Sequence, residues 1–228
     1  MLNSKELRVK AWDSLKGKYW TAFFVCLLLG VLISIGTSII TCSQNMLDIV
    51  NMVDHSEMDS TMELGALVII GLASVIGIIG FLISLFVGSA AEVGLANYFI
   101  KNTDSKPSFG DAFSGFKVKY GRNIGTLLLV GIKIVLWSIL FIIPGIIKTY
   151  EYAIIPYILA DDSEISSKGA FKKAKQMMKG NKWRLFKLEL SFFGWFVLCV
   201  LTLGIGTFFL IPYVEAATAE FYSELKNN

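Results

Sequence analysis

The chain has 228 residues, of which 54% are hydrophobic and 17% are charged, and its formal net charge at pH 7 is +3. Its mean hydropathy is +0.62, and several apolar runs approach or exceed the roughly 20 residues that a helix needs to cross a bilayer. These values exclude an ordinary soluble domain and indicate an integral membrane protein. Cys26, Cys42 and Cys199 lie within or beside apolar runs, so the sequence predicts neither a disulfide framework nor a metal site.

Residues 4–16 have the pattern of an amphipathic helix at the start of the chain. Ser4 is expected to cap this helix, and Gly17 is expected to end it because glycine tolerates the left-handed conformation. A first span is predicted from about Trp20 to Cys42. The apolar face of the helix carries Leu7, Ala11 and Leu15.

Residues 43–63 form an acidic stretch that holds five Asp or Glu residues and no Lys or Arg. Since loops rich in Lys and Arg face the cytoplasm, this stretch is expected to face away from it. Residues 64–100 make an apolar run of about twice the minimum spanning length. We expect one long helix there, with a re-entrant break near Gly88 as the alternative. Small residues between Gly77 and Gly80 would let a neighbouring helix approach closely.

A second amphipathic helix is predicted to begin near Pro107 and to be closed by residues 121–122. A span from about residue 124 to 143 follows it. Pro144 and the glycine after it are then expected to turn the chain into a shorter span that ends near Ala160. The apolar stripe of the second amphipathic helix recurs at helical spacing and consists of Phe109, Ala112, Phe113, Phe116 and Tyr120.

A third amphipathic helix is predicted to open at Asp161, with Phe171, Ala174 and Met178 on its apolar face. Its basic face suits an anionic membrane surface, and its place between spans favours lipid headgroups over nucleic acid as the partner. A final hairpin is expected to run from residue 183 to about 222. The candidate lipid-headgroup contacts on the basic face are Lys168, Lys172, Lys173, Lys175 and Lys179.

The three amphipathic helices and the apolar segments after them indicate an internal repeat. The motif Lys-Gly-x-x-Trp begins at Lys16 and again at Lys179, whereas the middle copy has Gly121 followed by Ile124 in place of Trp. With six transmembrane helices, most Lys and Arg residues fall on the same side of the membrane as the two termini. Because Lys and Arg are enriched in cytoplasmic loops, we expect six transmembrane helices with both termini cytoplasmic. They would form three hairpins, each preceded by a cytoplasmic interfacial amphipathic helix. The predicted repeat units are approximately residues 4–102, 107–161 and 163–226 of one membrane domain, residues 1–228.

The second helix of each predicted hairpin carries a glutamate that is followed six residues later by an aromatic residue. Each glutamate is expected to lie about 15 Å deep, near the bilayer centre. A carboxylate there costs a few kcal/mol, so it should face the bundle interior, find a partner or carry a proton. Lys148 lies three residues before Glu151, and Lys133 lies on the preceding span. The candidate intramembrane polar site consists of Glu92, Glu151, Glu215, Lys133, Lys148, Tyr98 and Tyr157.

These glutamates have a functional and a structural interpretation. In the functional one they line a polar cavity for a lipid headgroup, an ion or protons. In the structural one they are buried carboxylates whose hydrogen bonds and charges are paired within the protein, and they hold the hairpins in register. A second structural possibility is that helix tilt brings them to the membrane interface. The sequence has no nucleophile elbow, phosphate-binding glycine loop, His/carboxylate cluster or Cys-x-x-Cys motif, so nothing in it argues for catalysis or for a cofactor.

Several motifs resemble those of a known family. They are Pro144-Gly145-Ile146 followed by Tyr150 and Tyr152, Met178-Lys179-Gly180, Leu190-Ser191-Phe192-Phe193-Gly194-Trp195, Thr202-Leu203-Gly204-Ile205-Gly206, and Pro212-Tyr213 followed by Phe221-Tyr222. In these motifs the chain resembles the DUF975 family of bacterial integral membrane proteins, which looks distantly similar to the membrane domain of some glycerophosphodiester phosphodiesterases. The resemblance implies a multi-pass plasma membrane protein and brings no catalytic residues with it.

The expected function is therefore non-enzymatic handling of a lipid or an ion at the intramembrane polar site. Anionic lipids of the cytoplasmic leaflet are the expected partners, and nucleic acid is not. The alternative is a scaffold or accessory subunit for a membrane enzyme or an exporter, which would bring a protein partner or a homo-oligomer. A lipid-modifying enzyme would need a second polar cluster beside the glutamates.

Overall fold

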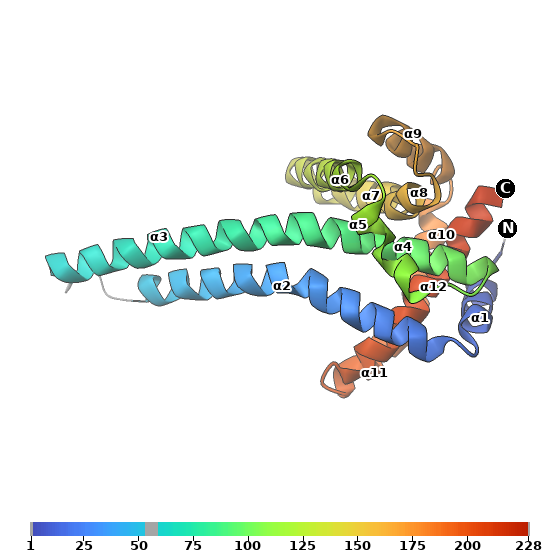
Figure 1. Ribbon diagram of the computed structural model, residues 1–228, viewed down its shortest axis with the longest axis horizontal. Coiled ribbons are helices and arrows are strands. Elements are labelled where there is room, and N and C mark those ends of the chain that lie inside the picture. The colour runs from blue at the N-terminus through green and yellow to red at the C-terminus, as the bar shows by residue number, and fades with distance from the viewer. Residues whose placement is uncertain (1, 53–58, 228) are drawn as a thin grey trace. The chain divides into compact units, whose positions relative to one another are not determined.

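The computed structural model describes residues 2–52 and 59–227, and all of the elements in these ranges are helices (Figure 1). The predicted all-helical class is therefore confirmed, while six spans in three hairpins stay a prediction. Asp54 and Glu57 of the acidic stretch lie outside the described residues. The helical stretches that are long and apolar enough to cross a membrane are Tyr19–Asn51, Ser60–Asp104 and Tyr120–Leu140.

The smaller of two compact units spans Gly30–Gly88. It contains most of α2 (Tyr19–Asn51), all of α3 (Ser60–Ile83) and the π-helical turn η2 (Ser84–Gly88). Helical conformation then continues into the next element and ends only at Asp104. The predicted single long helix is confirmed, and the alternative break near Gly88 is wrong because the π turn keeps the backbone hydrogen-bonded.

Within this smaller unit, α2 and α3 approach each other at small residues. A Cβ atom on Gly80 would meet the Ile39 side chain at 2.8 Å and the Gly36 carbonyl oxygen at 3.0 Å. Nearby, the Ser43 hydroxyl donates a 2.8 Å hydrogen bond to the Ala73 carbonyl oxygen. The predicted close approach at Gly80 is therefore confirmed.

The larger unit consists of the chain up to Leu29 and from Ser89 onwards. It begins with α1 and the first residues of α2. Its helices, in chain order, are α1 (Ser4–Leu15), α4 (Ser89–Asp104), the 3-10 helix η3 (Phe109–Phe113), α5 (Ser114–Lys117), α6 (Tyr120–Leu140), α7 (Ile142–Tyr152), α8 (Ile155–Asp161), α9 (Ser167–Met177), α10 (Lys182–Leu190), α11 (Phe193–Leu201) and α12 (Ile205–Asn227).

Helix α4 is the centre of the core of the larger unit. It packs against α1, α6, α8 and α12, and against η3 with α5. Its Tyr98 and Phe99 side chains are fully buried, as are Phe221 and Tyr222 of α12. In Figure 1, the red ribbon of α12 runs past the green ribbon of α4. The core thus joins segments that are more than 100 residues apart in the chain.

The α4 helix lies so close to η3 and α5 that only glycine fits at the contact. A Cβ atom on Gly94 would overlap the carbonyl oxygen of Ala112, and a Cβ atom on Gly115 would overlap that of Ala90. The middle amphipathic segment, η3 with α5, therefore contacts α4 through backbone atoms rather than through side chains.

Asn3, and not Ser4, caps α1. The Asn3 side chain accepts a backbone N–H bond of the first turn, and Glu6 accepts the Asn3 N–H at 2.7 Å. This reciprocal pattern needs a Glu three residues after the cap. Ser4 is followed at that spacing by Leu7, which explains why the cap lies one residue earlier than predicted.

The middle amphipathic helix is shorter than predicted, because α5 ends at Lys117 and Lys119 adopts a left-handed conformation with φ 46°. Gly121 therefore lies in the first turn of α6 and does not close the preceding helix. Arg122 of the same turn donates hydrogen bonds to backbone carbonyls of the segment after α8, including Asp162 at 3.0 Å and Ser163 at 2.7 Å. These contacts anchor the start of α6.

Two other predicted boundaries are also displaced. The turn after α6 is made by the extended residue Phe141, and Pro144 lies in the first turn of α7, where its missing N–H costs little. Helix α9 is capped by Ser166 and does not open at Asp161. Asp162 instead accepts backbone N–H bonds from the next residues and closes a turn before the helix.

Candidate functional site

Three residues of the predicted polar site lie together in the larger unit, one on each of three helices. Glu92 comes from α4, Tyr157 from α8 and Glu215 from α12. The Tyr157 hydroxyl donates a 2.9 Å hydrogen bond to Oε2 of Glu215. The carboxylates of Glu92 and Glu215 are near enough for their like charges to repel each other. We call these three residues the Glu92–Glu215 cluster.

The two carboxylates of this cluster have no basic partner among the described residues, whose ion pairs all involve other acids. Tyr157 is 5% exposed, Glu215 is half-buried, and Glu92 lies on the protein surface. Within the hydrocarbon core of a membrane, two neighbouring carboxylates cannot both stay charged without a counter-charge. The arrangement is therefore suited to holding a proton or a cation.

Glu151 belongs to a different cluster. Its carboxylate, on α7, accepts a 2.7 Å hydrogen bond from Lys148 and a second hydrogen bond from Lys182 at the start of α10. Glu151 is 4% exposed, so its single negative charge meets two ammonium groups where water is scarce. The expected Lys148 partner is present, whereas Lys182 was not expected, because it comes from a helix 31 residues away in the chain. This cluster therefore consists of two ion pairs that share one carboxylate.

Lys133 and Tyr98, the remaining residues of the predicted site, contact neither group of carboxylates. The Lys133 ammonium lies 3.5 Å from the centre of the Phe171 ring and 6.0 Å from that of Tyr152, in cation–π geometry. Tyr98 is fully buried in α4, and its hydroxyl has no hydrogen-bond partner among the described residues. Neither residue therefore neutralises the Glu92–Glu215 cluster.

The basic residues of α9 and its C-terminal turn lie mostly on the surface. Lys168, Lys172, Lys175 and Lys179 are exposed and Lys173 is half-buried. On the opposite side, Ala170, Ala174 and Met178 are fully buried. The predicted headgroup contacts are thus accessible.

Three buried asparagines have a shared role that sequence reasoning missed. Each donates its side-chain amide to a carbonyl at the C-terminal end of a helix that precedes an apolar segment. Asn102 binds the Ser14 carbonyl of α1 at 3.1 Å, and Asn181 binds the Met177 carbonyl of α9 at 2.8 Å. Asn123 binds carbonyls at the end of α5, at 3.0 and 3.3 Å. At the end of each of the three amphipathic helices, a backbone carbonyl therefore accepts a hydrogen bond from an asparagine side-chain amide.

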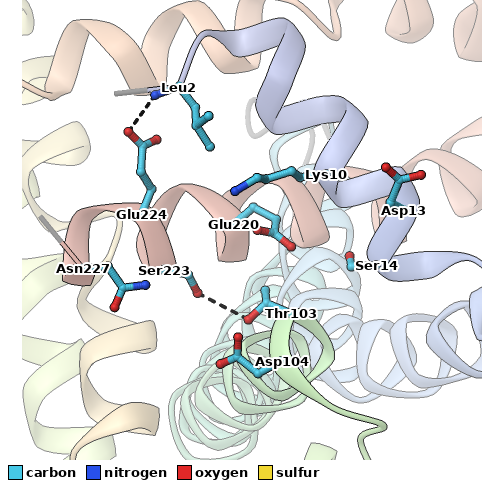
Figure 2. Close-up of a pocket in the computed structure, with 10 residues that line it drawn as sticks. All are labelled: Leu2, Lys10, Asp13, Ser14, Thr103, Asp104, Glu220, Ser223, Glu224 and Asn227. Carbon is cyan, nitrogen blue, oxygen red and sulfur yellow. Dashed lines mark hydrogen bonds between the residues drawn. The ribbon is translucent and has the colours of Figure 1, made fainter.

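A polar cavity of about 580 Å³ lies between α1 and the C-terminal ends of α4 and α12 (Figure 2). Figure 2 shows Lys10 as the single basic side chain drawn among four carboxylates. Arg184 pairs with Glu224, which neutralises one of these acids. No group of three or more potential ligands among the described residues is arranged to hold a metal ion. The cavity is lined by Leu2, Lys10, Asp13, Ser14, Thr103, Asp104, Glu220, Ser223, Glu224 and Asn227.

Comparison with known proteins gives one match. Residues 139–228 match the model of DUF975, which is described as a protein of unknown function. The match covers the segment from the end of α6 to the end of the chain, and it supports the resemblance to DUF975 there. The resemblance was expected over essentially the whole chain, and residues 1–138 lie outside the match. No curated protein and no solved structure matches the chain.

Proposed function

We propose that this is a multi-pass plasma membrane protein that handles protons or a small cation within the membrane and is not an enzyme. The observation that carries the proposal is the Glu92–Glu215 cluster, in which two carboxylates repel each other and have no basic partner among the described residues. A purely structural carboxylate in this chain has a different environment, since Glu151 is held by two lysines. The contrast between the two clusters favours function at Glu92 and Glu215.

The proposal includes six spans in three hairpins, with both termini cytoplasmic. The hairpins would be α2 with α3–α4, α6 with α7–α8, and α10–α11 with α12. The asparagine contacts support a relation between the second and third units, because Asn123 and Asn181 each follow the amphipathic helix of their unit within a few residues and bond its last carbonyls. Left-handed residues at Gly17, Lys119 and Gly180, one after each amphipathic helix, support a threefold repeat.

A cation fits the cluster better than a lipid phosphate does. A phosphate would bring a third negative charge beside two carboxylates, at a cost that no described basic residue offsets. A proton or a monovalent cation removes the repulsion between them. The anionic lipids would instead meet the exposed lysines of α9, whose positive charge suits the cytoplasmic leaflet.

The proposal is tested by carbodiimide labelling of the purified protein in liposomes. Dicyclohexylcarbodiimide reacts with protonated carboxylic acids in apolar surroundings, and peptide mass spectrometry shows which glutamate has reacted. We expect Glu92 or Glu215 to react, and the reaction to slow as the pH rises. Protection by Na⁺ or K⁺ would identify a cation as the ligand, and pH dependence without such protection would identify protons.

Glu151 is the internal control, because it lies in the same membrane domain and is neutralised by Lys148 and Lys182. It should stay unlabelled. Equal reactivity of all three glutamates, or none at Glu92 and Glu215 at any pH, would refute the ion site. A stoichiometric protein partner that co-purifies with the unreactive protein would then favour the scaffold function.

A further inference from the structure

An apolar groove of about 510 Å³ lies in the larger unit, between the α1–α2 junction and the α11–α12 pair. Trp12 and Trp195 stand at its walls with about half of their surfaces exposed, at 50% and 52%. The hydroxyls of its two tyrosines donate hydrogen bonds within the protein. Tyr19 donates to the Phe209 carbonyl at 2.7 Å, and Tyr213 donates to the Arg8 carbonyl at 3.2 Å. The groove therefore offers mainly ring faces and aliphatic carbon to an occupant.

A positive charge that has no counter-ion in the described part of the chain lies beside this groove. Arg8 is one helical turn before Trp12, on the same face of α1. Its Nη1 donates a 2.9 Å hydrogen bond to the Ser191 carbonyl, while its Nε is buried with no partner among the described residues. No described carboxylate pairs with Arg8. The described residues around the guanidinium thus supply backbone and ring contacts but no negative charge.

We propose that this groove binds one acyl chain of an anionic glycerophospholipid, with the phosphate of the lipid at Arg8. The volume of the groove is in the range of small-molecule sites, and its lining is mostly apolar. An amphiphile with one anionic end matches an apolar groove with one unpaired cation beside it. A zwitterionic lipid such as phosphatidylcholine also carries a choline cation, whose repulsion from Arg8 offsets the attraction of its phosphate, and a soluble anion would leave the groove empty. The proposal rests on the membrane location proposed above and does not depend on the ion site.

The test uses the full-length protein in phosphatidylcholine vesicles. Each sample contains a small fraction of either phosphatidylglycerol or phosphatidylcholine that carries a photoreactive diazirine on one acyl chain. After illumination, peptide mass spectrometry measures the labelling of α11 and α12. We expect the phosphatidylglycerol probe to label these helices about tenfold more than the phosphatidylcholine probe, as the strength of a charge-assisted hydrogen bond implies.

Variants locate the two ends of the lipid. Arg8→Gln should lower the labelling by phosphatidylglycerol to the level of phosphatidylcholine, and Arg8→Lys should keep part of the preference. Lys10→Gln removes the same charge from the part of α1 that lines the cavity of Figure 2, and it should change nothing. Leu198→Trp fills the groove and should lower labelling by both probes.

The proposal is refuted if the two probes label equally, if Arg8→Gln and Lys10→Gln behave alike, or if Leu198→Trp leaves labelling unchanged. Circular dichroism of each variant checks that it is folded. If Arg8→Gln does not fold, the two separate variants Arg8→Lys and Leu198→Trp still test the proposal. Carbodiimide reactivity of Glu92 in the same samples reports on the ion site separately, so either proposal can fail alone.

Discussion

The hydroxyl of Tyr157 donates a 2.9 Å hydrogen bond to Glu215, although the two residues are 58 positions apart in the chain. Tyr157 also stacks on Tyr222 of α12, with ring centres 5.7 Å apart. This contact ties α8 to α12 and provides the single hydrogen bond that the Glu215 side chain makes to another described residue. It therefore links the stability of the core to the proposed ion site.

Changing Tyr157 to Phe should destabilise the protein by about 1.5–3 kcal/mol, because a carboxylate in apolar surroundings loses its donor while the ring stacking is kept. The free energy of unfolding in mixed detergent micelles measures this. Tyr150→Phe is the matched control, because the Tyr150 hydroxyl bonds Glu189 on the surface. The control should cost less than about 1 kcal/mol, and equal losses for the two variants would contradict the prediction.

Changing Glu151 to Gln should destabilise the protein by about 3–5 kcal/mol, because Lys148 and Lys182 would lose their common partner in a poorly hydrated site. Glu92→Gln removes a carboxylate that has no basic partner among the described residues, so it should be neutral or slightly stabilising. Thermal unfolding followed by circular dichroism separates the two. A larger loss for Glu92→Gln would show that Glu92 has a structural partner.

Changing Gly94 to Ala should cost about 1–3 kcal/mol, because the added Cβ overlaps the carbonyl oxygen of Ala112 and the two segments must separate. Gly125→Ala on α6 is the control, since nothing lies within 4 Å of the added atom. That variant should gain up to about 1 kcal/mol from the higher helix propensity of alanine. Measured melting temperatures that move in the same direction for both would argue against the close approach of α4 to η3.

The stability contribution of Asp111 should depend on pH. Its hydrogen bond and ion pair with Lys101 lower the pKa of the Asp111 carboxyl, and the Ser108 N–H bond adds to this. A lowered pKa in the folded state means that stability is present above the unfolded pKa of about 3.9 and is lost as the pH falls through the folded value. Because Lys101 is about half exposed, at 47%, the contribution should be no more than about 1 kcal/mol.

The check is the difference in melting temperature between the wild type and Asp111→Asn. It should be constant from pH 7 to about pH 5 and shrink as the pH falls below about 4. Asp13→Asn is the control, because Asp13 pairs with Lys16 in a more exposed position on the surface. A difference that grows on acidification would mean that the sign of the Asp111 interaction is wrong.

Local sequence patterns predicted the features that depend on near neighbours in the chain. The long apolar runs indicated membrane-length helices because spanning requires only length and composition. Lys148 was expected beside Glu151 because three residues along a helix bring side chains to one face. Glycine at position 17 has the left-handed conformation that its place between two helices predicted.

Tertiary packing decided which charged and polar groups meet, because these contacts join helices that are far apart in the chain. The packing of α4 against α8 and α12 separates Glu92 and Glu215 from Glu151, although all three have the same spacing to an aromatic residue. Lys182 pairs with Glu151 from another helix, and Asn102 donates a hydrogen bond to the Ser14 carbonyl at the end of α1, 88 residues away in the chain. Periodicity assigns a residue to a face of its own helix, and only the fold determines which other helix that face contacts.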